Sequence, residues 1–372
     1  MTHANLPDFA SDLGRALESL GAGRVDTPVI QPAEPFLDMA GEDLRRRIFL
    51  TESETGESLC LRPEFTIPVC RAHIAEGVAT PRRYCYLGQV FRQRRDGSNE
   101  FYQAGIEDLG ETDLARADAR AIAEAHTLLS ALVNASLSTI VGDQAVFEAV
   151  VAGLGLPVGW QKRLIHAFGN QQALDAMIAR LAAPQSATAT DPDIAALLQA
   201  GDADRLASHI TEVMEATGYS THASRTPAEI ARRLVEKRQL EEIRLSDAAL
   251  SALRSFLALE APLADAEAAL SDFAESAGLD IAQACWAFGA RVEALKAVGA
   301  DLGSMTWRAA FGRPLDYYTG LVFEIAAGEG GPVLAGGGRF DRMMELLGAR
   351  DPIPAVGFSL WLDRIQAARS RP

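Results

Sequence analysis

The sequence predicts an α+β fold, in which an antiparallel sheet flanked by helices is interrupted by a helical insertion. Residues 82–110 contain two runs rich in aromatic and β-branched side chains on either side of an Asp-Gly-Ser-Asn turn, which is typical of a β-hairpin. Between about Leu154 and Asp301 alanine is abundant and strand patterns nearly vanish, and strand patterns return at Met305. We therefore expect a sheet-based domain that helices split in the sequence. The expected boundaries are 1–153 and 302–372 for this domain and 154–301 for the helical insertion.

The composition and charge are those of an ordinary globular protein. The 372 residues suffice for two or three domains, and 48% of them are hydrophobic and 23% charged. The formal net charge of -15 argues against binding nucleic acid or an anionic membrane over the whole surface, although it leaves room for a local basic site. Residues 1–7 lack the pattern of a signal peptide, and no apolar run is long enough to cross a bilayer, so we expect a cytoplasmic protein.

The cysteines and histidines do not follow a metal-binding pattern. None of the four cysteines belongs to a Cys-x-x-Cys pair, and the six histidines show neither His-x-x-His nor His-x-x-x-His spacing. We therefore expect reduced thiols, no bound metal and no cofactor.

Two elements are expected before the hairpin. Leu13, Leu17 and Leu20 recur at helical spacing and predict an amphipathic helix over residues 6–20. Residues 25–36 contain three prolines, which exclude a central strand because proline cannot donate to the ladder. This segment is either an extended edge or interface segment or a plain connector.

The second strand of the hairpin carries polar chemistry on one face. Because side chains alternate across a strand, Gln103 and Glu107 share a face with the Phe101 ring. Gly105 lies between them on that face and leaves room. An amide and a carboxylate beside an aromatic ring suit a small polar ligand that carries an amine.

Arginines gather on the first strand and the turn: Arg82, Arg83, Arg92, Arg94 and Arg95. In a chain with an excess of acid, such a group indicates a local anion site. A solvated turn would explain the same arginines equally well.

Helices are expected on both sides of the insertion boundary. Thr112 or Asp113 can cap a helix whose apolar residues recur at three- and four-residue steps, and a strand is expected over residues 137–141. Within the insertion, the stretch Thr226-Pro227-Ala228-Glu229 is a capping box, and Ser246 begins another helix.

The hairpin resembles motif 2 of the class II aminoacyl-tRNA synthetases, and specifically that of the histidine enzyme. The pattern Tyr-x-Gly-x-x-Phe-Arg followed by Phe-x-Gln-x-Gly-x-Glu is matched at both strands. Four other stretches are similar to the same family: Leu-Arg-Pro-Glu-x-Thr at 61–66, Leu-Asp-Tyr-Tyr at 315–318, a Gly-Gly-Arg-Phe-Asp turn at 337–341 and motif 3 at 355–364. The resemblance covers the chain from about Leu6 to Ile365 and is weakest in the insertion. It implies a class II aminoacyl-tRNA synthetase-like fold, with residues 25–36 at a homodimer interface.

The resemblance also implies a pocket for histidine. In the family, the glutamate of the first stretch binds the α-amino group, and a buried ammonium needs such a partner because breaking a buried charge pair costs about 3–5 kcal/mol. The arginine near the Leu-Asp-Tyr-Tyr motif acts on the carboxylate and the α-phosphate, and the tyrosines shape the pocket for the imidazole. We expect no catalytic residues. The predicted histidine-binding residues are Glu64, Thr66, Arg92, Gln103, Glu107, Arg313, Tyr317 and Tyr318.

The departures from the family concern ATP and tRNA. The chain stops eight residues after Arg364, so we expect no anticodon-binding domain. Trp361 stands where the family has a glycine that lets adenine approach the backbone, and Arg94 replaces a glutamate that reads adenine. Pro314 replaces a glycine beside Arg313 and removes a backbone amide. With a short tRNA-contacting loop as well, we expect no tRNA binding and a degenerate ATP site at Arg94, Trp361 and Arg364.

This combination resembles the regulatory subunits of ATP phosphoribosyltransferase, a synthetase-like family without the anticodon-binding domain. The resemblance implies a non-catalytic subunit that pairs with the short-form catalytic subunit and forms a homodimer within a hetero-octamer. It also implies feedback control of the first step of histidine biosynthesis by L-histidine. A pocket without chemistry is useful because a ligand with different affinities for two assembly states shifts their balance.

Other functions stay open at this stage. A compact histidine-activating synthetase-like ligase is the main alternative, because Arg92, Arg313 and Arg364 can together orient a triphosphate. The phosphoribosyltransferase catalytic chain itself is disfavoured, because no acidic pair precedes the Thr319-Gly320 stretch to manage a ribose and Mg²⁺. A purely structural interaction module would be favoured by a failure to bind histidine.

Overall fold

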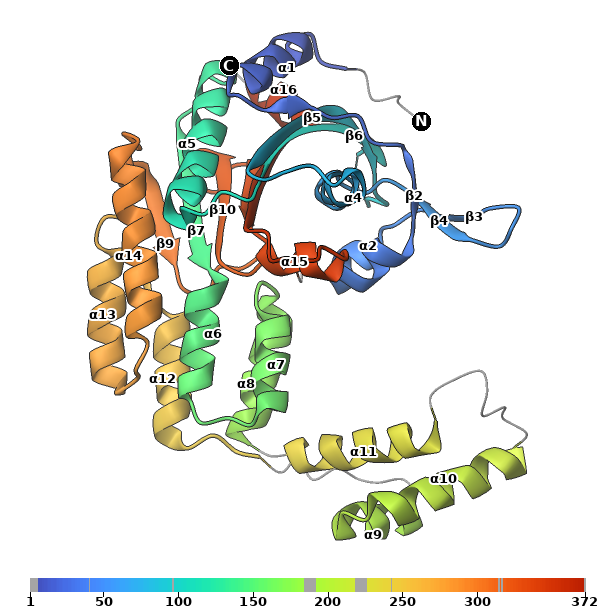
Figure 1. The fold of residues 1–372 in the computed structure, drawn as a ribbon. Coiled ribbons are helices and arrows are strands. Elements are labelled where there is room, and N and C mark those ends of the chain that lie inside the picture. Colours follow the sequence, from blue (N-terminus) through green and yellow to red (C-terminus); the bar gives the residue numbers. More distant parts are fainter. Residues whose placement is uncertain are drawn as a thin grey trace.

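The computed structural model describes residues 6–39, 41–95, 97–183, 192–217, 226–241, 243–313, 315 and 317–370. Within these residues, a mixed sheet of nine strands forms the centre of the molecule (Figure 1). In spatial order its strands are β1 (Gly23–Arg24), β5 (Arg82–Phe91), β6 (Glu100–Leu109), β12 (Ala355–Trp361), β11 (Val333–Arg339), β10 (Leu321–Ala327), β7 (Leu137–Asp143), β9 (Met305–Arg308) and β8 (Glu260–Pro262). Neighbours from β5 to β7 are antiparallel, whereas β1 is parallel to β5 and β9 is parallel to β7. The predicted α+β fold is confirmed, and its antiparallel part is the centre of the sheet.

The predicted hairpin is formed by β5 and β6. Phe101 and Leu109 of β6 pack into one hydrophobic core, whereas Ala104 and Ile106 pack into a second core on the opposite face. The alternation of side chains predicted for this strand is therefore confirmed. Since Gln103 and Glu107 share the face of Phe101, their side chains lie on the side of the sheet where the first of these cores packs.

Helices cover both faces of the sheet. On the side of Ala104 lie α1 (Ala10–Ser19), α5 (Leu114–Leu132) and α16 (Leu362–Arg369). On the side of Phe101 lie α2 (Glu34–Met39), α4 (Thr66–Glu76) and α15 (Asp341–Leu346), and Figure 1 shows α4 inside the curve of the sheet. The capping residue of α5 is Asp113, which accepts a hydrogen bond from the amide of Arg116 at 3.1 Å.

The amino-terminal segment differs from its prediction in detail. The helix begins at Ala10 rather than at Leu6, although Leu13 and Leu17 are buried as expected. Part of the proline-containing segment is strand, and a helix begins already at Glu34. The strand belongs to a small antiparallel sheet with the order β2 (Ile30–Pro32), β4 (Ser58–Leu61) and β3 (Leu50–Glu52), and the short helix α3 (Glu42–Arg45) precedes β3.

The region predicted as an insertion is largely helical. Within it lie α7 (Val158–Ala167), α8 (Gln171–Ala182), α9 (Pro192–Ala200), α10 (Ala203–Thr217), α11 (Pro227–Glu241), α12 (Asp247–Leu257), α13 (Ala266–Ala277) and α14 (Ala282–Ala297). Helix α6 (Gln144–Gly153) precedes the expected boundary, and η1 (Leu302–Ser304) follows it. The capping box is confirmed, because the Thr226 amide donates to Glu229 at 3.0 Å and the Glu229 amide donates to Thr226 at 3.3 Å. Ser246 caps α12 by accepting from the Ala249 amide. Strand β8 was not predicted, since three residues that end in proline carry no readable alternation.

The helices of this region pack in two ways. Helices α6 to α8 and α12 to α14 share the core beneath the sheet, whereas α9 to α11 enclose a small core of their own (Figure 1). A buried cluster of charges ties α14 to the sheet. Arg291 donates to Asp118 at 2.8 Å and to Asp143 at 2.7 Å, and Arg339 donates to Asp118 at 2.9 Å.

Candidate functional site

One cavity brings together all eight residues predicted to bind histidine. They come from the loop before α4, the end of β5, strand β6 and the segment that precedes β10, which approach each other on the concave side of the sheet. Trp361 lines the same cavity, together with glycines of β11 and β12. Pro314, expected to remove an amide beside Arg313, lies outside the described residues.

The loop before α4 supplies the first acidic group. Glu64 is 4% exposed, and its carboxylate accepts hydrogen bonds from the amides of Thr66 at 2.7 Å and Ile67 at 2.9 Å. Burial raises the pKa of Glu64, and these two amide bonds oppose the rise. The carboxylate therefore sits at the amino terminus of α4, where free amides and the helix dipole favour negative charge.

Strand β6 supplies the second acidic group. Glu107 is 1% exposed, and one of its oxygens accepts a hydrogen bond from the Thr66 hydroxyl at 2.8 Å. Burial raises the pKa of Glu107 well above its usual value, and the negative charge of Glu64 adds to the rise. Among the described residues, neither the other oxygen Oε2 of Glu107 nor the amide oxygen of Gln103 has a hydrogen-bond donor. Two buried acceptors thus face the cavity without a partner.

Arginines form the opposite side of the cavity. Arg92 donates to the carbonyl of Pro63 at 2.7 Å, and burial lowers its pKa to about 10, with Glu64 opposing the change. The Nε atom of Arg313 lies 3.6 Å from Glu324, and its guanidinium lies 5.7 Å from the ring centres of Tyr318 and Trp361. The cavity therefore has an acidic floor and a basic wall, which suits a zwitterion.

Two tyrosines add an aromatic wall. The ring centres of Tyr317 and Tyr318 are 4.9 Å apart, and Phe340 meets Tyr317 edge-on at 6.1 Å. Burial raises the pKa of Tyr317 well above its usual value, so this phenol stays neutral and can donate or accept a hydrogen bond. An apolar wall with a polar tip is suited to a planar heterocycle.

Glycines let these groups approach closely. A Cβ atom at Gly357 would lie 1.8 Å from Oε2 of Glu107, and one at Gly336 would lie 2.3 Å from Nη1 of Arg313. The turn that the resemblance implied at residues 337–341 is not found over its first part, because strand β11 continues to Arg339 and includes the three adjacent glycines. The glycines are needed for space beside Arg313 and Phe358 rather than for a turn.

The predicted ATP residues lie at the rim of this cavity. The guanidinium of Arg94 lies 3.4 Å from the centre of the Phe101 ring and forms an ion pair with Asp363 at 2.9 Å. The guanidinium of Arg364 lies 4.8 Å from the centre of the Trp361 ring and donates to the carbonyl of Val333 at 2.9 Å. The chain's own side chains thus cover the aromatic surfaces on which a base could stack.

The hypothesis of a single anion site made of five arginines is wrong. Arg82 and Arg83 are the first residues of β5 and Arg92 follows its last residue, so the two groups lie at opposite ends of the strand. Arg83 is neutralised by Asp108, with its Nε atom at 3.3 Å, and by Glu124. Of these five arginines, only Arg92 lines the cavity.

The free volume of the cavity is small. It measures about 40 Å³, which is room for only a few water molecules. A ligand of the size of an amino acid therefore requires side chains to move. The described part of the chain contains no group of three or more His, Cys, Asp or Glu residues that could hold a metal ion. All four cysteines are free thiols, and no described helix is long and apolar enough to cross a membrane.

Several lining residues were not recognisable as such in the sequence. Gly357 lies opposite Glu107 in the pairing of β12 with β6. The two strands are far apart in the sequence, so no local pattern gives this register. Ser359 of β12 also lines the cavity, and its hydroxyl is 2.8 Å from the hydroxyl of Tyr86 on β5.

Comparisons with known proteins agree with this fold. A family model described as histidyl-tRNA synthetase matches residues 3–240 and 222–365. The structure is similar to the "ATP phosphoribosyltransferase regulatory subunit/histidyl-tRNA synthetase" of Bacillus halodurans, with a TM-score of 0.67 and 20% identity over 100% of this chain and 82% of that chain. It is also similar to the histidyl-tRNA synthetase of Nostoc, with a TM-score of 0.63 and 15% identity over 99% of this chain and 75% of that chain.

Relatives with much higher identity carry one shared name. A protein of Rhizobium rhizogenes is 63% identical over 367 residues, which are 98% of this chain and 99% of that protein. A protein of Sinorhizobium medicae is 64% identical over 372 residues, which are 99% of this chain and 98% of that protein. Both are named ATP phosphoribosyltransferase regulatory subunit.

The fold and the matching family model define a protein with a histidyl-tRNA synthetase-like class II domain. Within this class, the chain belongs to the family of ATP phosphoribosyltransferase regulatory subunits.

Proposed function

We propose that this chain is a non-catalytic subunit that assembles with the short-form ATP phosphoribosyltransferase catalytic subunit. In this complex it is needed for activity and for histidine feedback control of the first step of histidine biosynthesis. The observation that carries the proposal is the 64% identity, over nearly the full length of both chains, to a relative with that name. The complex is cytoplasmic and contains homodimers of this chain within a hetero-octamer. Exposed apolar side chains on the small sheet, Ile30 and Leu50, support an interface there.

The ligand of the cavity is L-histidine. Its ammonium binds Glu64 and Gln103, its imidazole lies between Glu107 and the tyrosine pair, and its carboxylate reaches Arg92 or Arg313. The unpartnered acceptors on Gln103 and Glu107 support this arrangement, because a buried acceptor without a donor costs about 1–3 kcal/mol. A ligand with donors at both positions removes that cost. Its heterocycle also fits beside the neutral phenols of the tyrosines.

The ATP part of the ancestral site is degenerate. Arg94 covers the Phe101 ring, and Asp363 holds Arg94 in that position. Trp361 fills the place where the resembling family has glycine, and Arg364 is engaged by Trp361 and a backbone carbonyl. An adenine would have to displace these contacts. The chain therefore retains an amino-acid pocket without activating its ligand, and it does not bind tRNA.

The small cavity suggests how histidine acts on the complex. Because the ligand does not fit into about 40 Å³, its binding favours a conformation in which the cavity walls have moved. If the catalytic subunit has a different affinity for that conformation, linkage makes histidine change the assembly or its activity.

The experiment that tests the proposal combines two measurements on the isolated chain with one on the complex. Calorimetry measures histidine binding, and histidine-dependent exchange of pyrophosphate into ATP measures activation. We expect binding without exchange, and we expect the catalytic subunit to become histidine-sensitive only when this chain is added. Clear exchange would instead establish the histidine-activating ligase, and absence of histidine binding would leave a structural module.

A further inference from the structure

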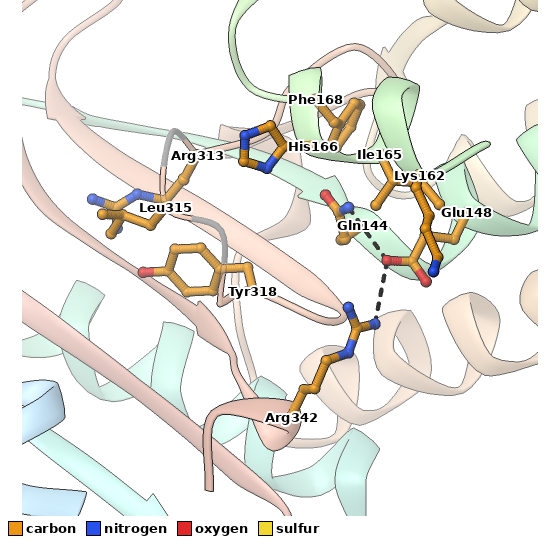
Figure 2. A pocket seen from close by; sticks show the side chains of 10 residues that line it. All are labelled: Gln144, Glu148, Lys162, Ile165, His166, Phe168, Arg313, Leu315, Tyr318 and Arg342. Carbon is orange, nitrogen blue, oxygen red and sulfur yellow. Dashed lines mark hydrogen bonds and ion pairs between the residues drawn. The ribbon is translucent and has the colours of Figure 1, made fainter. Parts of the chain in front are cut away.

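A second, larger cavity adjoins the histidine cavity. It measures about 320 Å³ and lies between α6, α7, α15 and the segment that carries Arg313 and Tyr318 (Figure 2). Arg313, Leu315 and Tyr318 line both cavities, so these three side chains are a shared wall. The proposed function gives the larger cavity no role.

Its lining carries positive charge from three separate elements. Lys162 on α7, Arg342 on α15 and Arg313 all line the cavity (Figure 2). The chain as a whole has a formal net charge of -15, and Lys162 is one of only three lysines in the sequence. An excess of cations at one concave place in an acidic protein is the electrostatic signature of an anion site.

One carboxylate in the wall helps to arrange these groups. Glu148 accepts a hydrogen bond from Gln144 at 3.4 Å and lies 3.6 Å from Arg342. Figure 2 shows both interactions with Glu148 between the two side chains. The carboxylate is thus engaged by two other side chains of the wall. Even with Glu324 3.6 Å from Arg313, the three cations outnumber the two carboxylates.

The wall between the charges is apolar. Phe168 is fixed by stacking on Phe147, with ring centres 4.2 Å apart, and Ile165 and Leu315 also line the cavity. The cations belong to three different elements, and guanidinium and ammonium groups both bind phosphate oxygens. A polar end and an apolar wall together suit a phosphate attached to an organic group.

The two cavities are also joined by tight backbone packing. A Cβ atom at Gly169 would lie 2.8 Å from the carbonyl oxygen of Arg313, and one at Gly312 would lie 2.6 Å from the ring of Phe168. The loop after α7 therefore lies directly on the backbone that holds Arg313. A ligand that moves α7 or its loop must move the shared wall as well.

We propose that the larger cavity binds a small phosphate-bearing molecule and that its occupancy changes the affinity of the neighbouring cavity for histidine. The coupling rests on the proposed function, whereas the phosphate site does not. A complex whose name includes ATP and a phosphoribosyl group handles such ligands. Binding of such a ligand in the larger cavity would change the histidine affinity of the neighbouring cavity through Arg313 and Tyr318, which line both.

Calorimetry with inorganic pyrophosphate tests the site on the whole chain. Lys162→Ala and Arg342→Ala should each weaken pyrophosphate binding roughly tenfold. Lys296→Ala removes the same charge from an exposed pair with Glu293 and should leave binding unchanged. Equal affinity in all three variants, or no binding to the unmodified chain, would overturn the site. Tighter binding of succinate than of pyrophosphate would overturn the assignment to phosphate.

Two further variants locate the ligand and separate the site from the proposed function. Arg364→Ala should retain pyrophosphate binding, and loss of binding only there would move the phosphate to the old ATP site and overturn the proposal. Glu107→Ala should retain pyrophosphate binding while losing histidine binding. Saturating pyrophosphate should shift the histidine affinity of the unmodified chain by several-fold, and Lys162→Ala should need roughly tenfold more pyrophosphate for the same shift. An unchanged histidine affinity would overturn the coupling, whereas pyrophosphate binding without any histidine binding would refute only the proposed function.

Discussion

The hydroxyl of Thr66 donates to one carboxylate oxygen of Glu107 at 2.8 Å and ties the start of α4 to strand β6. This bond leaves the second oxygen of Glu107 directed at the cavity without a donor. Thr66 therefore positions the carboxylate, and in the proposed complex the ligand would complete its hydrogen bonding. The arrangement makes Glu107 the residue whose replacement separates ligand binding from folding most cleanly.

Glu107→Gln should weaken histidine binding by roughly tenfold or more, because hydrogen bonds to a charged group contribute about 1.5–3 kcal/mol. Glu107→Ala should weaken it further, and both variants should still assemble with the catalytic subunit. Calorimetry measures the first effect and size-exclusion chromatography of the mixture the second. Glu54→Gln, on an exposed turn, is the matched control. Unchanged histidine affinity in the Glu107 variants would remove this residue from the binding site.

The raised pKa of Glu107 predicts how the ligand-free chain responds to pH. Burial favours the neutral carboxyl, so the folded state keeps a proton that the unfolded state loses near pH 4.3. The contribution of Glu107 to stability is therefore fully present below about pH 4.3 and is lost as pH rises toward the folded pKa. Its loss has a slope of about 1.4 kcal/mol per pH unit inside that window.

Urea denaturation of the unmodified chain and of Glu107→Gln at pH 5.5 and 7.5 measures this effect. The amide cannot titrate, so the variant should gain stability relative to the unmodified chain as pH rises. Glu64 has a raised pKa in both proteins and cancels in the comparison. A difference in stability that is the same at both pH values would show that Glu107 is ionised in the folded chain.

The contact between Gly357 and Glu107 makes a steric prediction. A methyl group at Gly357 would overlap Oε2 of Glu107, so Gly357→Ala should abolish histidine binding and destabilise the chain by about 1–3 kcal/mol. Gly14→Ala is the control, because its nearest neighbour is 4.0 Å away and alanine favours the helix by about 1 kcal/mol. Thermal unfolding of both variants provides the comparison. Normal histidine binding by Gly357→Ala would contradict the observed register of β6 and β12.

Much of the site could be predicted because motifs keep residue types at fixed spacing. The predicted residues Gln103 and Glu107 are four positions apart on one strand. Their shared face follows from the alternation of side chains along a strand, which can be predicted without knowing the fold. The partner strand could not be predicted in the same way. Gly357 meets Glu107 only through pairing across the sheet, and nothing near Gly357 in the sequence indicates that neighbour.

The wrong predictions have physical causes of the same kind. Three adjacent glycines are typical of a turn, but here tertiary packing requires their lack of side chains inside a strand. Arg82 and Arg92 are close in sequence, yet an extended chain rises about 3.3 Å per residue and carries them to opposite ends of the strand. Cavity size is likewise a property of packing, so the larger cavity beside Tyr318 had no counterpart in the sequence.

The buried charge cluster predicts a large effect far from the ligand. Arg291→Met leaves the carboxylates of Asp118 and Asp143 without one of their partners, and breaking a buried pair costs about 3–5 kcal/mol. Lys296→Ala breaks an exposed pair on the same helix and should cost less than about 1 kcal/mol. Urea midpoints of the two variants test the contrast. Similar midpoints would mean that α14 is held to the sheet by its apolar contacts alone.

The stacking of Arg94 on Phe101 predicts that ATP binding can be recovered. Arg94→Glu together with Trp361→Gly installs the residues of the resembling synthetases, removes the guanidinium from the ring and empties the space of the indole. The unmodified chain should show no ATP binding in calorimetry and no histidine-dependent pyrophosphate exchange. The double variant should gain measurable ATP binding, because base stacking on an aromatic ring contributes about 1–3 kcal/mol.

The conservative variant Arg94→Lys keeps the charge and should bind ATP as poorly as the unmodified chain. Equal ATP affinity in all three proteins would show that Arg94 and Trp361 do not control access to Phe101.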